Sequence, residues 1–171
     1  MMRKMAIFLG LAVAVLIGPA PFPALAQDKA QAPEATAEPP IEASDPARIA
    51  QILQDFGYRA LLEKDSQGDP VIRTTFSQVN SSIFFYSCTD GADCKVIQFA
   101  AGFDLKDGIS LSKLNDWNRN KLFGAAYRDD EDDPWLKMTV NLEGGVTPQN
   151  LRHTIEWWQV IIDDFKEHID F

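Results

Sequence analysis

Between residues 110 and 130 the chain reads S-L-S-K-L-N-D-W-N-R-N-K-L-F-G-A-A-Y-R-D-D. In this stretch a series of predicted strands gives way to a helix, and strands then resume. The helix is expected to begin at Ser110 or Ser112. The side chains it is expected to bury are Leu111, Leu114 and Trp117. The same short helix carries the most unusual local chemistry of the chain, the polar and aromatic residues Asn115, Trp117, Asn118 and Arg119.

Upstream of this stretch, short segments rich in β-branched and aromatic residues alternate with turn residues. This pattern favours an antiparallel meander with one covered face. The predicted strands are residues 58–64, 71–78, 82–88 and 94–103. A helix is expected before them, because Asp45 is a good N-cap, Pro46 suits the first helical position and Gly57 supplies a stop.

Downstream, residues 123–129 and 135–142 predict a second hairpin around an acidic turn. The last helix is expected to start with Thr147 as N-cap and Pro148 at its first position. One apolar stripe runs along this helix, formed by Leu151, Ile155, Trp158, Ile162, Phe165 and Ile169. The order helix, four strands, helix, two strands, helix predicts an α+β fold, an antiparallel sheet with flanking helices.

Trp157 and Ile161 widen the apolar stripe of the last helix on one flank. One interpretation is a broad helix face that lies across the sheet. The other is that both side chains belong to the edge of a partner-binding or homodimer surface, because large exposed aromatic residues mark such surfaces.

The N-terminus has the three parts of a secretory signal. Arg3 and Lys4 are a basic start, residues 5–17 are apolar, and Ala-Leu-Ala at 24–26 fits the signal-peptidase rule, which predicts cleavage before Gln27. The apolar part is short for a membrane span, so stable insertion after cleavage is not expected; an uncleaved anchor is the alternative. We therefore expect a periplasmic or secreted protein from a bacterium with a Gram-negative type of envelope.

Residues 27–44, rich in Ala, Pro, Glu and Gln, predict a disordered spacer before a domain at 45–171. Without Arg3 and Lys4 the chain keeps 14 basic residues against 25 acidic ones, a formal charge of −11. Phosphate recognition needs a concentrated positive field, so nucleic acid is not an expected partner.

The motif L-N-D-W-N-R at 114–119, followed by F-G-A-A-Y at 123–127, resembles the YbjN family of bacterial proteins. Further similarity lies at 57–58, 68–70, 88–94 and 142–146, and the resemblance covers residues 47–165. The family carries the description of a sensory transduction regulator. The resemblance implies a fold similar to type III secretion chaperones, which bind extended segments of other proteins, and it brings no catalytic residues. The export signal distinguishes this chain from the better-known cytoplasmic members.

Cys88 and Cys94 flank a short glycine-containing hairpin loop. Two cysteines in an exported protein are expected to form a disulfide, here a structural one that contributes roughly 2 kcal/mol. Residues 129–133 form an acidic cluster, for which a solvated turn and a Ca²⁺ site are the two interpretations; the spacing is not that of an EF-hand. No metal ligand set, cofactor motif or catalytic motif is predicted.

Asn115 and Asn118 disfavour the interior of a helix and tend to bond to nearby backbone. They are expected to tie the short helix to neighbouring strand backbone while Trp117 fills the core. The alternative is that Asn118 and Arg119 face a groove and bind an incoming extended peptide.

The sequence thus predicts an exported, non-enzymatic module that binds an unknown protein or peptide. Its candidate partner-binding residues are Asn115, Trp117, Asn118, Arg119, Trp157 and Ile161. The alternatives are an enzyme of unrecognised type, with carboxylates gathered by the fold, and a structural or stress-response component of the envelope.

Overall fold

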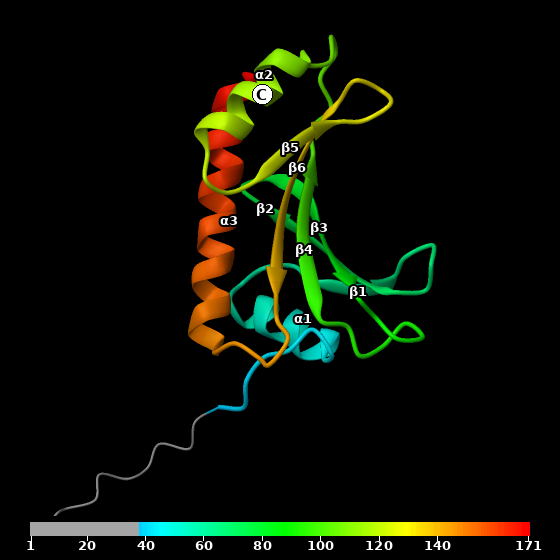
Figure 1. Cartoon of the computed structure of the whole chain (residues 1–171). Coiled ribbons are helices and arrows are strands. Elements are labelled where there is room, and N and C mark those ends of the chain that lie inside the picture. The colour runs from blue at the N-terminus through cyan, green and yellow to red at the C-terminus, as the bar shows by residue number, and fades with distance from the viewer. Residues whose placement is uncertain (1–37) are drawn as a thin grey trace, which may run out of the picture. The chain divides into compact units, whose positions relative to one another are not determined.

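A computed structural model describes residues 38–171. Within these residues, three helices and six strands follow the order α-β-β-β-β-α-β-β-α (Figure 1), as predicted. The helices are α1 (Pro46–Asp55), α2 (Leu111–Asn120) and α3 (Pro148–Ile169). The strands are β1 (Leu61–Lys64), β2 (Pro70–Phe76), β3 (Val79–Tyr86), β4 (Val96–Gly102), β5 (Ala125–Arg128) and β6 (Pro134–Asn141). The predicted signal peptide and residues 27–37 of the predicted spacer lie outside the described residues.

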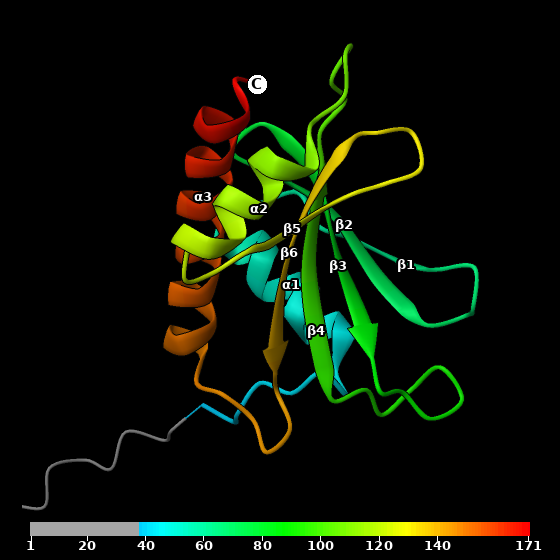
Figure 2. The ribbon, with the colours of Figure 1, turned by 45° about the horizontal axis from the view of Figure 1, so that its top comes forward.

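The strands form one antiparallel sheet in the order β1-β2-β3-β4-β6-β5. The first four strands are a meander, as the turn residues between them predict. After β4 the chain passes through α2, returns at the outer edge as β5, and then inserts β6 beside β4 (Figure 2). Helix α2 therefore lies next to the edge strand β5.

The helices cover one face of the sheet and leave the other face open (Figure 1). Alternate strand residues on the covered face are buried against the helices, because successive side chains point to opposite faces. Phe99 of β4, for example, packs on Trp158 of α3 with ring centroids 5.7 Å apart. The apolar stripe predicted along α3 is confirmed, since each of its six members is at least 95% buried.

The caps that fix the helix starts also follow the sequence. The Ser110 hydroxyl accepts a bond from the Lys113 N–H at 3.2 Å and so sets the start of α2. The Thr147 hydroxyl accepts one from the Asn150 N–H at 3.1 Å, and Pro148 occupies the first turn of α3. These bonds satisfy N–H groups that a helix start leaves without partners.

Two details of the sequence interpretation are wrong. Leu111 is 62% exposed, because it is the first residue of α2 and Ile109, 7% exposed, takes the core position before the helix. The first strand is shorter than predicted, and its Leu62 is 44% exposed at the sheet edge, beyond the cover of the helices. Just before the predicted domain, Ile41 is fully buried and pairs with Val146.

The disulfide predicted between Cys88 and Cys94 is confirmed. It closes the loop between β3 and β4, where the Lys95 N–H donates to the Tyr86 carbonyl at 3.1 Å. Within residues 38–171, no helix is long and apolar enough to cross a membrane.

Candidate functional site

Trp117 is the residue that fastens α2 to the rest of the protein. Its side chain is 1% exposed and meets Phe165 of α3 edge to face, with ring centroids 4.8 Å apart. Its indole N–H donates to the Gly124 carbonyl at 2.6 Å. Trp117 is thus a core residue, as one interpretation of the sequence held.

Asn118 ties the same helix to the edge of the sheet. Its side-chain amide donates to the Ala126 carbonyl at 2.9 Å, and its oxygen accepts from the Ala126 N–H at 2.8 Å. The amide therefore takes the place of a neighbouring strand at β5 and closes an edge that would otherwise offer free backbone groups. Asn118 has these atoms engaged within the chain, which supports its structural interpretation over peptide binding.

A small apolar hollow of about 230 Å³ lies where the loop after α2 meets α3. Four exposed side chains surround it, Leu122, Phe123, Trp157 and Val160. The Phe123 and Trp157 rings lie 6.0 Å apart between centroids. We call this group, with the buried Trp117 and Ile161, the apolar hollow. Its rim carries an ion pair between Lys121 and Asp164, with an N–O distance of 2.7 Å.

The structure brings three of the six predicted partner-binding residues together in the apolar hollow: Trp117, Trp157 and Ile161. Trp157 is 57% exposed, whereas Ile161 is only 6% exposed and is therefore not a surface residue. The reason is Gly124, whose backbone lies so close that a Cβ there would be 2.6 Å from Ile161 Cγ2. Asn115, Asn118 and Arg119 do not line the hollow.

The sequence did not identify Leu122 and Phe123 as candidate partner-binding residues. Leu122 is 87% exposed and Phe123 is 50% exposed. The signal that could have found them is local: two consecutive apolar residues follow the end of a polar helix and precede Gly124, whose φ of +81° is unfavourable for other residues.

A larger hollow, which we call the sheet groove, lies on the open face and has a volume of about 630 Å³. It crosses the middle strands, where the side chains are small: Ser82 of β3, then Ala100 and Gly102 of β4. The Trp135 indole lies over Gly102, where a Cβ would be 2.8 Å from the ring. Small residues at the centre and large ones at both ends produce the hollow.

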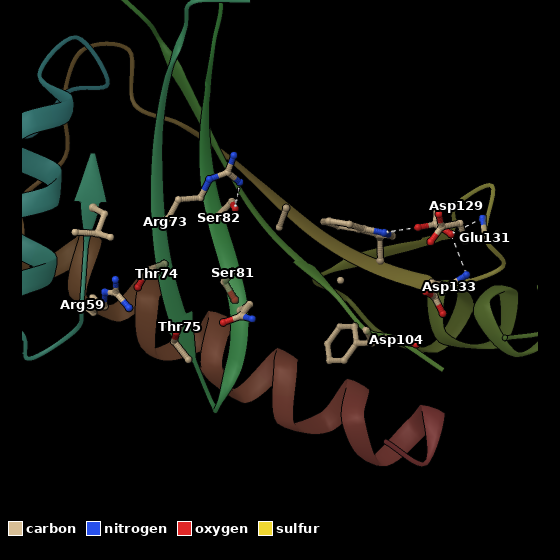
Figure 3. A pocket seen from close by; sticks show the side chains of 16 residues that line it. Arg59, Arg73, Thr74, Thr75, Ser81, Ser82, Asp104, Asp129, Glu131 and Asp133 are labelled. Carbon is tan, nitrogen blue, oxygen red and sulfur yellow. Dashed lines mark hydrogen bonds between the residues drawn. The ribbon is translucent and has the colours of Figure 1, made fainter. Parts of the chain in front are cut away.

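Opposite charges occupy the two ends of the sheet groove (Figure 3). Arg59 and Arg73 lie at the β1–β2 end. Carboxylates lie at the other end, near the turn between β5 and β6: Asp104, Asp129, Glu131 and Asp133. The sequence interpretation did not identify this groove, because its ends are far apart along the chain.

The carboxylate of Asp129 organises the acidic turn. It accepts bonds from the backbone N–H groups of Glu131 and Asp133 at 3.0 and 2.9 Å, and from the Trp135 indole N–H at 2.8 Å. The indole bond, followed by the two backbone bonds, lowers the pKa of Asp129. This carboxylate is a turn-forming acceptor, and within residues 38–171 no cluster of His, Cys, Asp or Glu has the arrangement of a metal site.

Replacing Trp135 by Phe is expected to raise the pKa of Asp129 toward its ordinary value of about 3.9. A lowered folded-state pKa contributes stability that is present above that ordinary value and is lost as the pH falls through the folded-state pKa. The stability lost in W135F should therefore be larger at pH 6 than at pH 2. Carboxyl-carbon NMR titration measures the pKa, and urea unfolding at the two pH values measures the stability.

The control for this experiment is the same Trp135→Phe change in an Asp129→Asn background. Without the carboxylate, the effect of losing the indole should no longer depend on pH. An Asp129 pKa that stays unchanged in W135F would show that the indole bond does not cause the shift.

The match to a family model covers residues 45–171, which is most of the chain. The chain belongs to the YbjN family, whose description reads "Putative bacterial sensory transduction regulator". The resemblance to the YbjN family predicted from the sequence is thus confirmed. No curated protein shows significant similarity to the chain.

Proposed function

We propose that this protein is an exported, non-enzymatic module of the YbjN type that binds another protein through the apolar hollow. The observation that carries the proposal is the group of four large, exposed apolar side chains around one hollow: Leu122, Phe123, Trp157 and Val160. Contiguous exposed apolar surface marks interaction sites in soluble proteins.

The hollow has the composition of an interface centre. Aromatic residues such as Trp157 and Phe123 are enriched in binding hot spots, where a few side chains supply most of the binding free energy. Burying one such side chain stabilises a complex by about 1.5–3 kcal/mol. Protein interfaces have a polar rim around an apolar centre, and the ion pair between Lys121 and Asp164 supplies polar groups at the rim of the hollow. A partner segment that inserts an aliphatic or aromatic side chain between Phe123 and Trp157 fits this arrangement.

Two features support the exported and non-enzymatic parts of the proposal. The disulfide between Cys88 and Cys94 suits an oxidising compartment and agrees with the signal sequence. In the larger hollow the Asp129 carboxylate already accepts bonds from the N–H groups of Glu131 and Asp133 and from the Trp135 indole, so it serves the turn and is not free to act as a catalytic acid.

The test is photocrosslinking in the native envelope, with p-benzoylphenylalanine in place of Val160 in the full chain. One dominant protein adduct, identified by mass spectrometry and lost when Trp157→Ala is added, is the expected result. The matched control places the same probe at Gln51, an exposed residue of α1, and should not give this adduct. Identical adducts from both positions, or none from a folded and disulfide-bonded protein, would contradict the proposal. An adduct between two copies of this chain would contradict binding of a different protein and would indicate that the apolar hollow forms a homodimer interface.

A further inference from the structure

We propose that the sheet groove is a second binding site, which takes an extended peptide segment of mixed charge from another protein. In this arrangement the segment crosses the strands, with an acidic residue over Arg59 and Arg73 and a basic residue over Asp104 and Glu131. The argument rests on the shape of the groove, on its separated charges and on the distance between them.

The floor of the groove leaves room for the main chain of a peptide, because it is flat and its side chains are small. In the sheet register Arg73 faces Ser82, Ser82 faces Ala100, and Ala100 faces Lys137, so these residues form one row across the open face. Arg73, Ser82 and Ala100 of this row line the groove and Lys137 does not, so beyond Arg73 only a hydroxymethyl and a methyl group of the row rise from the groove floor. The groove volume of about 630 Å³ is within the range of ligand pockets, about 300–1,000 Å³.

The basic end has guanidinium groups available for a carboxylate. Arg59 is exposed and forms no ion pair within residues 38–171. Arg73 donates to the Ser82 hydroxyl at 2.7 Å, which aims its guanidinium along the groove, and its ion pair with Glu63 is long, at 3.5 Å. A guanidinium held in this way binds carboxylates through two N–H groups.

At the acidic end, two carboxylates are free for a ligand and two are not. Asp129 is taken up by the turn, and Asp133 accepts the Leu105 N–H at 2.9 Å. Asp104 and Glu131 are exposed and make no ion pair in the described part of the chain. They leave a negative potential that a Lys or Arg of the segment would complement.

The distance between the ends selects an extended peptide over a small zwitterion. Arg73 lies level with Ala100 across two strand spacings, about 10 Å, and Asp104 follows Ala100 by four residues, about 13 Å along the strand direction, so the two ends are about 16 Å apart. An extended chain advances about 3.3 Å per residue. The acidic and the basic residue of the segment should therefore be about four or five positions apart.

The sheet groove and the apolar hollow are independent sites, because the first lies on the open face and the second is built on the helices. The peptide experiment therefore tests the groove alone. If the peptides do not bind the sheet groove, the proposed function is unaffected, because photocrosslinking at Val160 tests it separately.

The experiment is isothermal titration calorimetry of the protein, exported with its own leader and then purified, with three blocked peptides. The mixed probe is Glu-Glu-Ser-Gly-Ala-Ser-Lys-Lys; the other two carry four glutamates or four lysines at the same places. We expect the mixed peptide to bind at least tenfold more tightly than either of the others, and its affinity to fall as NaCl rises from about 0.05 to about 0.5 M.

Charge reversal then identifies the residues. Arg59→Glu with Arg73→Glu should weaken the mixed peptide about tenfold and strengthen the tetralysine peptide, since both ends become acidic. The matched control, Lys95→Glu with Arg152→Glu, changes the net charge equally at residues outside the groove and should leave both affinities unchanged. If the double variant fails to fold, the single variant Arg59→Glu, which keeps the Arg73 contacts, is titrated in its place. No binding of the mixed peptide at 1 mM, equal affinity for the three peptides, or the same loss in the control variant overturns the proposal.

Discussion

Replacing Trp117 by Ala is expected to lower the free energy of unfolding by about 3–5 kcal/mol, the range for removing a fully buried Trp. The side chain is 1% exposed and packs edge to face on Phe165. Its removal leaves a cavity between α2 and α3 and also leaves the Gly124 carbonyl without its indole donor. Urea denaturation followed by far-UV circular dichroism measures the change.

The conservative variant Trp117→Phe separates packing from the hydrogen bond. Phe keeps an aromatic ring against Phe165 but cannot donate to Gly124, so a smaller loss of about 1–3 kcal/mol is expected. A loss below 1 kcal/mol in Trp117→Ala would mean that α2 does not depend on this side chain. Both variants should retain the disulfide, which a thiol assay checks.

Asn118→Ala is expected to cost about 2 kcal/mol, although the residue is on the surface side of α2. The change removes two hydrogen bonds at once and leaves the N–H and carbonyl of Ala126 without partners at the sheet edge. Thermal and urea unfolding give the loss. The exposed edge of β5 should also make the variant more prone to associate, which light scattering detects.

Asn115→Ala is the matched control, because Asn115 is the same residue type on the same helix and is exposed. Its stability should change by less than about 0.5 kcal/mol. If Asn118→Ala unfolds like the wild type but loses the adduct captured at Val160, the residue acts in partner binding and its structural assignment is wrong.

Ile161 and Leu122 show that a local sequence pattern does not by itself predict whether an apolar side chain is buried. Helical periodicity correctly placed Ile161 on the flank of the α3 stripe, yet it could not tell whether anything covers that flank. The cover is the backbone at Gly124, brought there by the return of the chain from α2 to β5. Leu122 is as apolar as Ile161 but lies in the turn that makes this return, and it is therefore exposed.

The sequence by itself determined the features that arise within one segment or between near neighbours. These are the helix caps at Ser110 and Thr147, the buried stripe of α3, the order of helices and strands, and the disulfide across a short loop. Each follows from periodicity, capping chemistry or short spacing, which depend on residues a few positions apart.

Only the tertiary structure decided which polar and aromatic residues meet. Strand order and register bring Arg59 and Arg73 to one end of a groove and Asp104 and Glu131 to the other. The insertion of β6 between β4 and β5 places α2 against α3, which buries Trp117 and gathers Phe123 and Trp157 at the surface. These contacts join residues far apart along the chain, and their geometry is set by the packing of the whole sheet rather than by any local pattern.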